Sequence, residues 1–154
     1  MTIQSVAGTK FKISATAPTA FTAAGYAALT YLTIGEVTAG LDSIGYEYAV
    51  IEHKPIDTRA VQIFKGSYSL KGGTLTVALD TDDAGQNLAK VAEKSDSDYY
   101  FDVEAQNGDH YYFPAKVMSF TRGFGGVDDI VSASIEIRPT VSKAGIGLIE
   151  VLAP

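Results

Sequence analysis

Apolar and polar residues alternate along most of this chain with a period of two, which is typical of β-strands with one buried face. The clearest example is TLTVALD at residues 74–80, where every second residue from Leu75 is apolar. The same alternation predicts further strands over residues 10–15, 32–38, 59–69, 98–106, 110–120 and 130–138. Asn107-Gly108 predicts a two-residue hairpin turn between two of these strands, because both positions tolerate a positive φ.

The period changes to that of a helix after residue 80. Apolar residues recur there on one helical face: Ala84, Leu88, Val91 and Ala92. Acidic residues at the start and lysines near the end suit the helix dipole, so we expect one helix over Asp83–Lys94. The whole pattern predicts a mainly β fold: an antiparallel β-sandwich or barrel with one flanking helix, in a single domain over residues 1–154.

A long insertion at residues 40–58 separates two of the predicted strands. Loops of this length are uncommon in small domains unless they are functional or disordered. This one carries strand-like apolar and aromatic residues, which we expect to form an arm between subunits: Ile44, Tyr46, Tyr48, Val50 and Ile51. Tyrosine is favoured at interfaces because it buries a large area and keeps a polar tip. The pattern therefore predicts an arm that lies against another copy of the chain.

The C-terminal tail, residues 139–154, is also too apolar for a solvated end. The residues expected to dock are Ile146, Leu148, Ile149, Val151 and Leu152. The sequence leaves open whether this tail packs on its own domain or on a neighbouring copy.

Composition narrows the classes of function. The formal charge is −6, which disfavours a protein that grips nucleic-acid phosphates, since that affinity comes mainly from lysine and arginine. The chain has no cysteine, so disulfides and thiolate metal sites are excluded. The start of the chain lacks the apolar core of a secretion signal, and the uncharged stretch at residues 13–35 is too interrupted for a membrane span. We expect a soluble product made in the cytoplasm, with no membrane partner.

Residues able to perform chemistry are few. Only His53 and His110 are present, and neither lies in a pattern that predicts a catalytic or metal site. The acidic cluster at residues 80–83 lacks the spacing of a calcium loop and is better explained by helix capping. Glycines at residues 123–126 lack the Lys-Ser/Thr of a phosphate-binding loop. The sequence therefore predicts no enzyme, no cofactor and no bound metal.

Two alternatives stay open at this point. One is a monomeric module that binds a sugar or peptide through its tyrosine-rich strands, which would need a concave aromatic cleft and no assembly. The other is a small hydrolase that uses His110 with Asp109 or Glu104.

The order of these elements resembles that of the major tail tube protein of long-tailed bacteriophages. That family is similar in fold to the tube protein of type VI secretion systems. The resemblance covers nearly the whole chain and is carried by Leu32–Arg59, by DTDDAGQNLAKVAEK with its flanking strands, and by EAQNGDHYYFPAKVMSF. It rests on the order of elements, because the family has no short signature motif.

The resemblance implies a virion structural protein that self-assembles into hexameric rings, stacked into a tube through which DNA passes. It implies assembly in the bacterial host cytoplasm and contact with other tail proteins, namely the tape measure, tail terminator and distal tail proteins. Six copies would carry six times −6, or −36, and an acidic wall repels phosphates. The candidate residues facing the lumen are Asp102, Glu104 and Glu136. A secretion-system tube of the same fold is the alternative within this resemblance.

Overall fold

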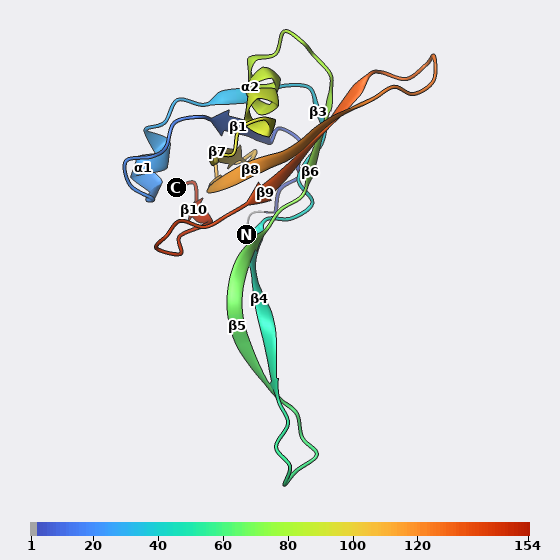
Figure 1. The fold of residues 1–154 in the computed structure, drawn as a ribbon. Coiled ribbons are helices and arrows are strands. Elements are labelled where there is room, and N and C mark those ends of the chain that lie inside the picture. Colours follow the sequence, from blue (N-terminus) through green and yellow to red (C-terminus); the bar gives the residue numbers. More distant parts are fainter. Residues whose placement is uncertain (1–2) are drawn as a thin grey trace.

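The structure, a computed structural model, describes residues 3–154, and Figure 1 shows a body of strands from which a long hairpin projects. Antiparallel strands dominate the described chain, as the sequence predicts, and a helix flanks them. The elements are β1 (Lys10–Ser14), α1 (Ala23–Ala27), β2 (Leu32–Ile34), β3 (Val37–Ala39), β4 (Gly45–His53), β5 (Gln62–Lys71), β6 (Thr74–Ala78), α2 (Ala84–Glu93), β7 (Tyr99–Glu104), β8 (His110–Gly123), β9 (Ser132–Pro139) and β10 (Ile149–Val151).

The main sheet has the strand order β2-β1-β7-β8-β9-β6-β3, with β10 also paired to β8. Its two outer strands, β2 and β3, are consecutive in the sequence. The single strand predicted over residues 32–38 is therefore wrong: the chain breaks at Gly35-Glu36, where Glu36 has a φ of 58°, and passes from one end of the sheet to the other. Because a positive φ is unfavourable for a residue with a Cβ, this corner is strained.

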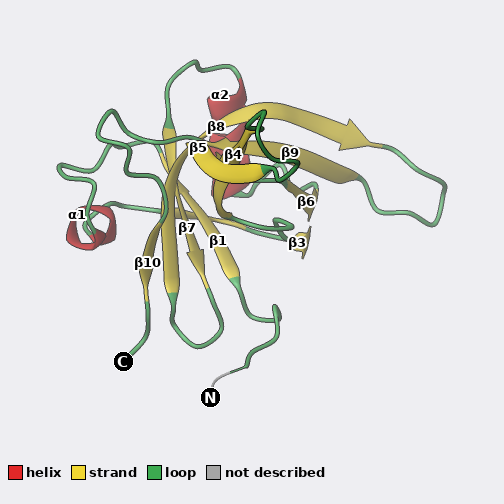
Figure 2. Cartoon of the chain, turned by 90° about the horizontal axis from the view of Figure 1, so that it is seen from below, coloured by secondary structure: helices red, strands yellow, loops and turns green. Residues whose placement is uncertain are grey.

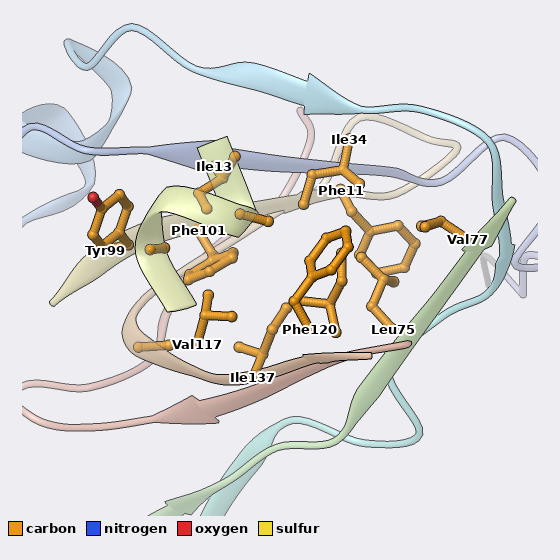
Figure 3. Close-up of a cluster of buried hydrophobic side chains, with 14 of the residues drawn as sticks. Phe11, Ile13, Ile34, Leu75, Val77, Tyr99, Phe101, Val117, Phe120 and Ile137 are labelled. Carbon is orange, nitrogen blue, oxygen red and sulfur yellow. The ribbon is translucent and has the colours of Figure 1, made fainter. Parts of the chain in front are cut away.

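The two ends of the sheet share one hydrophobic core, so the sheet is folded over on itself. Phe11 and Ile13 from β1 lie in the same buried cluster as Leu75 and Val77 from β6 (Figure 3). Phe101 and Phe113 stack in this cluster with ring centroids 5.5 Å apart. The apolar residues that the alternation pattern placed on the inward faces of these strands form this core.

Helix α2 bridges the two ends of the folded sheet, at the place, called the seam here, where Gly35 after β2 lies near Ala78 at the end of β6. Asp83 caps the helix: its Oδ2 accepts a hydrogen bond from the Gln86 N–H at 2.9 Å and from the Gly35 N–H at 3.1 Å. The fully buried Gln86 side chain donates to the carbonyls of Gly35 (3.0 Å) and Ala78 (2.9 Å). The predicted helix over Asp83–Lys94 is confirmed, with its two end residues acting as the caps.

The opposite face of the sheet is covered as well, which the sequence did not predict. Tyr26 from the short helix α1 is fully buried and packs on Tyr100 and Tyr112 (ring centroids 6.1 and 5.4 Å away). Thr22 caps the five-residue helix α1 by accepting a hydrogen bond from the Gly25 N–H. Strand β7 is consequently buried on both faces over Tyr99–Asp102.

Pro114 lies within β8, although proline has no N–H to donate to a strand ladder. On the side of β8 away from β7, β10 pairs with residues 110–112 and β9 pairs from Ala115 onward. Pro114 falls in the gap, and its carbonyl accepts a hydrogen bond from the Thr140 N–H at 2.9 Å. The N–H and C=O of one residue point to the same side of an antiparallel strand, so the donor that proline lacks is not needed by the ladder.

The C-terminal tail folds back onto its own chain. Strand β10 pairs with β8, and Figure 2 shows the two side by side near the C-terminus. Leu148 packs on the main core, and Ile149 and Val151 pack on the tyrosine cluster. Ile146 and Leu152 remain exposed. Neither α1 nor α2, the helices of residues 3–154, has the length and hydropathy needed to cross a bilayer.

Candidate functional site: two projections and a buried polar cluster

The long hairpin of β4 and β5 is the main projection and is called the arm here, residues 45–71 (Figure 1). It extends further along the sequence than the predicted insertion at 40–58. The strand expected over residues 59–69 does not belong to the body, because β5 pairs with β4 as the return strand of the arm. At ~3.3 Å per residue, the nine residues of β4 span about 30 Å.

Strand register assigns the side chains of the arm to two faces. Directly paired residues share a face, and the faces alternate along each strand. Tyr48 pairs with Tyr68 and Val50 pairs with Lys65, so β5 carries one extra residue, a β-bulge, between these pairs. The tyrosine face comprises Tyr46, Tyr48, Val50, Glu52, Ile63, Lys65, Tyr68 and Leu70, and the opposite face comprises Gly45, Glu47, Ala49, Ile51, His53, Gln62, Phe64, Ser69 and Lys71.

The arm is exposed nearly throughout. Every residue from 46 to 69 is exposed except Pro55 and Gly66, which are half-buried. Of the residues predicted for the arm, Tyr46, Tyr48, Val50 and Ile51 are exposed on it, whereas Ile44 precedes it and packs against the core. Large exposed apolar surface marks an interaction site in a folded protein.

The base of the arm is braced against the C-terminal tail. The Tyr46 hydroxyl accepts hydrogen bonds from the Gly147 N–H (3.0 Å) and the Leu148 N–H (3.2 Å), and the Tyr68 hydroxyl donates to the Gly145 carbonyl (3.0 Å). Gly145 has a φ of +82°, and a Cβ there would lie 2.4 Å from the Tyr68 hydroxyl. Glycine is thus required at this contact, and the tail sets the direction in which the arm leaves the body.

A second projection is the tip between β8 and β9, which points away from the arm in Figure 1. Asp129 orders the tip by accepting a hydrogen bond from the Gly126 N–H at 2.8 Å. Exposed apolar side chains gather on and beside it: Met118, Phe124, Val127 and Ile130. Alternation did not predict this surface, because these residues lie mostly in the loop itself.

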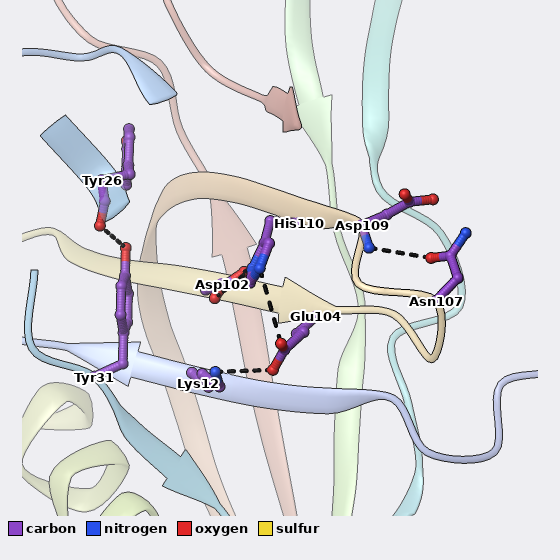
Figure 4. A network of polar contacts seen from close by, with 8 residues as sticks. All are labelled: Lys12, Tyr26, Tyr31, Asp102, Glu104, Asn107, Asp109 and His110. Atoms are coloured by element: carbon purple, nitrogen blue, oxygen red, sulfur yellow. Dashed lines mark hydrogen bonds and ion pairs between the residues drawn. The ribbon is translucent and has the colours of Figure 1, made fainter. Parts of the chain in front are cut away.

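A cluster of polar side chains lies on β1, β7 and β8, and Figure 4 shows it together with Tyr26 and Tyr31. Both Asp102 carboxylate oxygens lie 3.0 Å from His110 Nδ1, and His110 Nε2 lies 3.8 Å from Glu104. Lys12 Nζ is paired with Glu104 at 2.9 Å. Burial raises the pKa of Asp102, and the hydrogen bond from Lys12 lowers the pKa of Glu104. The cluster ties β1, β7 and β8 together through these polar contacts.

Of the two acidic residues in the hydrolase alternative, Glu104 lies near His110, with its carboxylate 3.8 Å from Nε2. His110 Nδ1 contacts Asp102 at 3.0 Å, and Asp109 Oδ1 accepts a hydrogen bond from the Ala153 N–H at 2.7 Å. Within residues 3–154 the polar contacts of the His110 ring are with the carboxylates of Asp102 and Glu104. His53 lies on the exposed arm. Within the same residues no cluster of histidine and acidic side chains has the arrangement of a metal site.

Most tyrosines of these strands are packed in the interior, whereas Tyr111 lines an apolar groove with Phe11 and Val103. Tyr100 and Tyr112 are buried under Tyr26, and Tyr31 donates its hydroxyl hydrogen bond to the Tyr26 carbonyl at 2.9 Å. Burial raises the pKa of Tyr26 and Tyr31 well above the usual range of tyrosine. The rings of Tyr26, Tyr31, Tyr100 and Tyr112 therefore form a second hydrophobic cluster. The large exposed tyrosines of the described chain are on the arm: Tyr46, Tyr48 and Tyr68.

The three residues predicted to face a lumen differ in their surroundings. Asp102 is only 2% exposed, so its assignment as a surface residue is wrong; α1 and its neighbouring segment cover the face of the sheet that the sequence took as open. Glu104 is partly buried and paired with Lys12. Glu136 is partly exposed, 3.7 Å from Arg138.

Comparisons with known proteins place the fold. No family model matches the sequence, and no curated protein matches it. Among solved structures, the chain is similar to the SPP1 tail tube, determined as a hybrid structure by solid-state NMR and cryo EM. The TM-score is 0.55 with 18% sequence identity over 92% of this chain and 75% of that chain. The chain therefore has the fold of a tail tube protein, and the predicted resemblance is confirmed at the level of the fold.

Proposed function

We propose that this chain is a structural subunit of a tail tube, which self-assembles into rings that stack through the arm. The observation that carries the proposal is the arm itself: a hairpin with tyrosines and aliphatic residues, held in a fixed direction, with almost no cover from its own chain. The tail tube fold of the solved neighbour supports it. A non-enzymatic role agrees with the surroundings of His110, whose ring contacts the carboxylates of Asp102 and Glu104.

The finer features of the proposal follow from the resemblance. Six copies close into a ring, since a head-to-tail contact that closes leaves no free surface to propagate laterally. The rings enclose a lumen for DNA, and Glu104 and Glu136 are the candidates to line it. The chain's net charge of −6 favours a conduit over a binding surface, because phosphates are repelled by an acidic wall. The tape measure, tail terminator and distal tail proteins are the proposed partners in the virion, with assembly in the host cytoplasm.

The decisive experiment shortens the arm without touching the body. Tyr46 and Leu70 are directly paired, so replacing residues 47–69 by Asn-Gly joins them through a two-residue turn. This variant keeps the Tyr46 brace and the Leu70 core contact. We expect the full chain to form stacked rings or tubes by negative-stain electron microscopy at high concentration, and the shortened chain to stay folded without stacking.

Circular dichroism and denaturant unfolding of the shortened chain provide the folding control. Tubes formed by the shortened chain would contradict the role of the arm. A full chain that stays monomeric at every concentration tested would contradict the function as a whole.

A further inference from the structure

The outer part of the arm, residues 50–64, exposes large apolar side chains on both of its faces, beside polar residues such as Glu52 and His53. Val50 and Ile63 lie on the tyrosine face and are 66% and 60% exposed. Ile51 and Phe64 pair with each other on the opposite face and are 51% and 52% exposed. The inner part differs, since only its tyrosine face is apolar and Glu47 and Ser69 occupy the other. Contact with a single partner requires exposed apolar side chains on one face of the ribbon, and the outer arm carries them on both faces.

One flat surface cannot cover both faces. Side chains on the two faces of a β-ribbon point in opposite directions, and a layer packed on either face lies ~10 Å away. The hollows found among residues 3–154 are small for such a ribbon: the apolar groove lined by Phe11, Leu41, Val103 and Tyr111 holds about 240 Å³, and the larger one at the tip between β8 and β9 holds about 440 Å³. Burial of the outer arm therefore requires a separate surface on each side.

The opposite net charges of the arm and the body indicate that other copies of the chain supply these surfaces. Residues 45–71 carry four basic and three acidic residues, a net charge of +1. Since the whole chain carries −6, the remainder carries −7. The arm of one copy is thus attracted to the acidic body of another, while bodies repel one another except where an arm lies between them.

We propose that the outer arm is clasped between two other copies of the chain, with the Val50–Ile63 face against one and the Ile51–Phe64 face against the second. This inference rests on the proposed self-assembly and specifies its contact. Each arm then joins three molecules. An arm bound to only one neighbour leaves its other face exposed, so the second neighbour adds to a contact that is already half formed, and assembly is cooperative.

Variants of each face test the proposal separately. One carries Val50→Ser with Ile63→Ser, the other Ile51→Ser with Phe64→Ser, and the control is Val91→Ser, an exposed apolar residue on α2. We expect each face variant to lower the association constant in sedimentation by about tenfold or more, which corresponds to ~1.4 kcal/mol, and the control to assemble normally. If either face variant assembles as well as the unaltered chain, the two-sided contact is refuted.

Cross-linking counts the partners. Because the chain has no cysteine, Val50→Cys and Ile51→Cys provide unique sites for a benzophenone label, singly or together. Labelled chains are assembled with a large excess of unlabelled chain and irradiated, so that each covalent product contains one labelled arm. We expect dimers from either single label and trimers from the double label. Dimers alone from the double label would show that one neighbour holds both faces. Failure of the unlabelled chain to assemble would instead refute the proposed function.

Discussion

Strand β7 and the arm strand β4 have nearly the same pattern and opposite surroundings. Both alternate aromatic or apolar residues with polar ones: Tyr99 and Phe101 in β7, Tyr46 and Tyr48 in β4. In β7 these side chains are buried in the main core, and even the intervening Tyr100 and Asp102 are covered. In β4 both faces remain open to solvent.

The difference shows that an apolar stripe in the sequence predicts burial of those side chains. It does not predict whether the same chain or a partner covers them. Strand β7 finds cover within its own chain, from β1 and β8 beside it, from the core on one face and from Tyr26 on the other. The arm has only the brace at its base. A stripe that the chain cannot cover indicates a surface for a partner, and the following experiments test this contrast.

The largest contrast is expected between two phenylalanines. Phe113 is fully buried against Phe101, so Phe113→Ala should lower the free energy of unfolding by about 3–5 kcal/mol. Phe64 on the arm is half exposed, and Phe64→Ala should change the same quantity by less than about 0.5 kcal/mol. Denaturant unfolding of the dissociated chain measures both. A similar loss for the two variants would mean that the arm belongs to the folding core.

The seam closed by α2 should give the next largest effect. Gln86→Ala removes the hydrogen bonds to the carbonyls of Gly35 and Ala78 and to the Asp80 N–H, so we expect a loss of about 2 kcal/mol. Asn87→Ala is the matched control, because Asn87 is the next helical residue and donates one exposed hydrogen bond to the Thr81 carbonyl. Equal losses for both, measured by thermal unfolding, would show that the seam is not sealed by Gln86.

Most of the body was predictable because local alternation and helical spacing determine it. The pattern gave β6, β7, β9 and α2 with small errors at their ends. It missed α1, whose five residues are too short to show a periodic stripe. It also missed the break at Gly35-Glu36, because the passage from one end of the sheet to the other is a property of the whole barrel.

The site was predictable only in part, for a related reason. Tyr46, Tyr48, Val50 and Ile51 were identified from their pattern, but the pairing of β4 with β5 across residues 54–61 is not visible in local sequence. Asp102 occupies a polar position in its strand, and only the packing of Tyr26 and its neighbours determines that this face is closed. The brace joins residues about a hundred positions apart, which no spacing rule reports.

The brace at the base of the arm should contribute less than the seam. Tyr46→Phe keeps the ring and removes the acceptor of two backbone hydrogen bonds, for an expected loss of about 1 kcal/mol in unfolding free energy. Tyr48→Phe removes a hydroxyl from the same face further out and should be close to neutral. A neutral Tyr46→Phe, with unchanged exchange of the Gly147 and Leu148 amides, would show that the tail does not hold the arm.

The smallest expected effect is on the pH dependence of stability. Burial raises the pKa of Asp102 above its unfolded value, so the folded chain binds this proton more tightly than the unfolded chain. The stability that this adds is present below the ordinary pKa of aspartate and is lost as the pH rises through the raised pKa. Asp102→Asn should therefore reduce the decline of unfolding free energy on raising the pH from acidic toward neutral. An unchanged slope would contradict this reading of the cluster.

The measurement that addresses the account most directly is amide hydrogen exchange, read by mass spectrometry, on the dissociated and the assembled chain. If sister copies supply the cover that the arm lacks, peptides from residues 46–69 exchange quickly in the dissociated chain and become strongly protected on assembly, while peptides from β7 and β9 are protected in both states. Arm peptides that exchange at the same rate in both states would contradict the account.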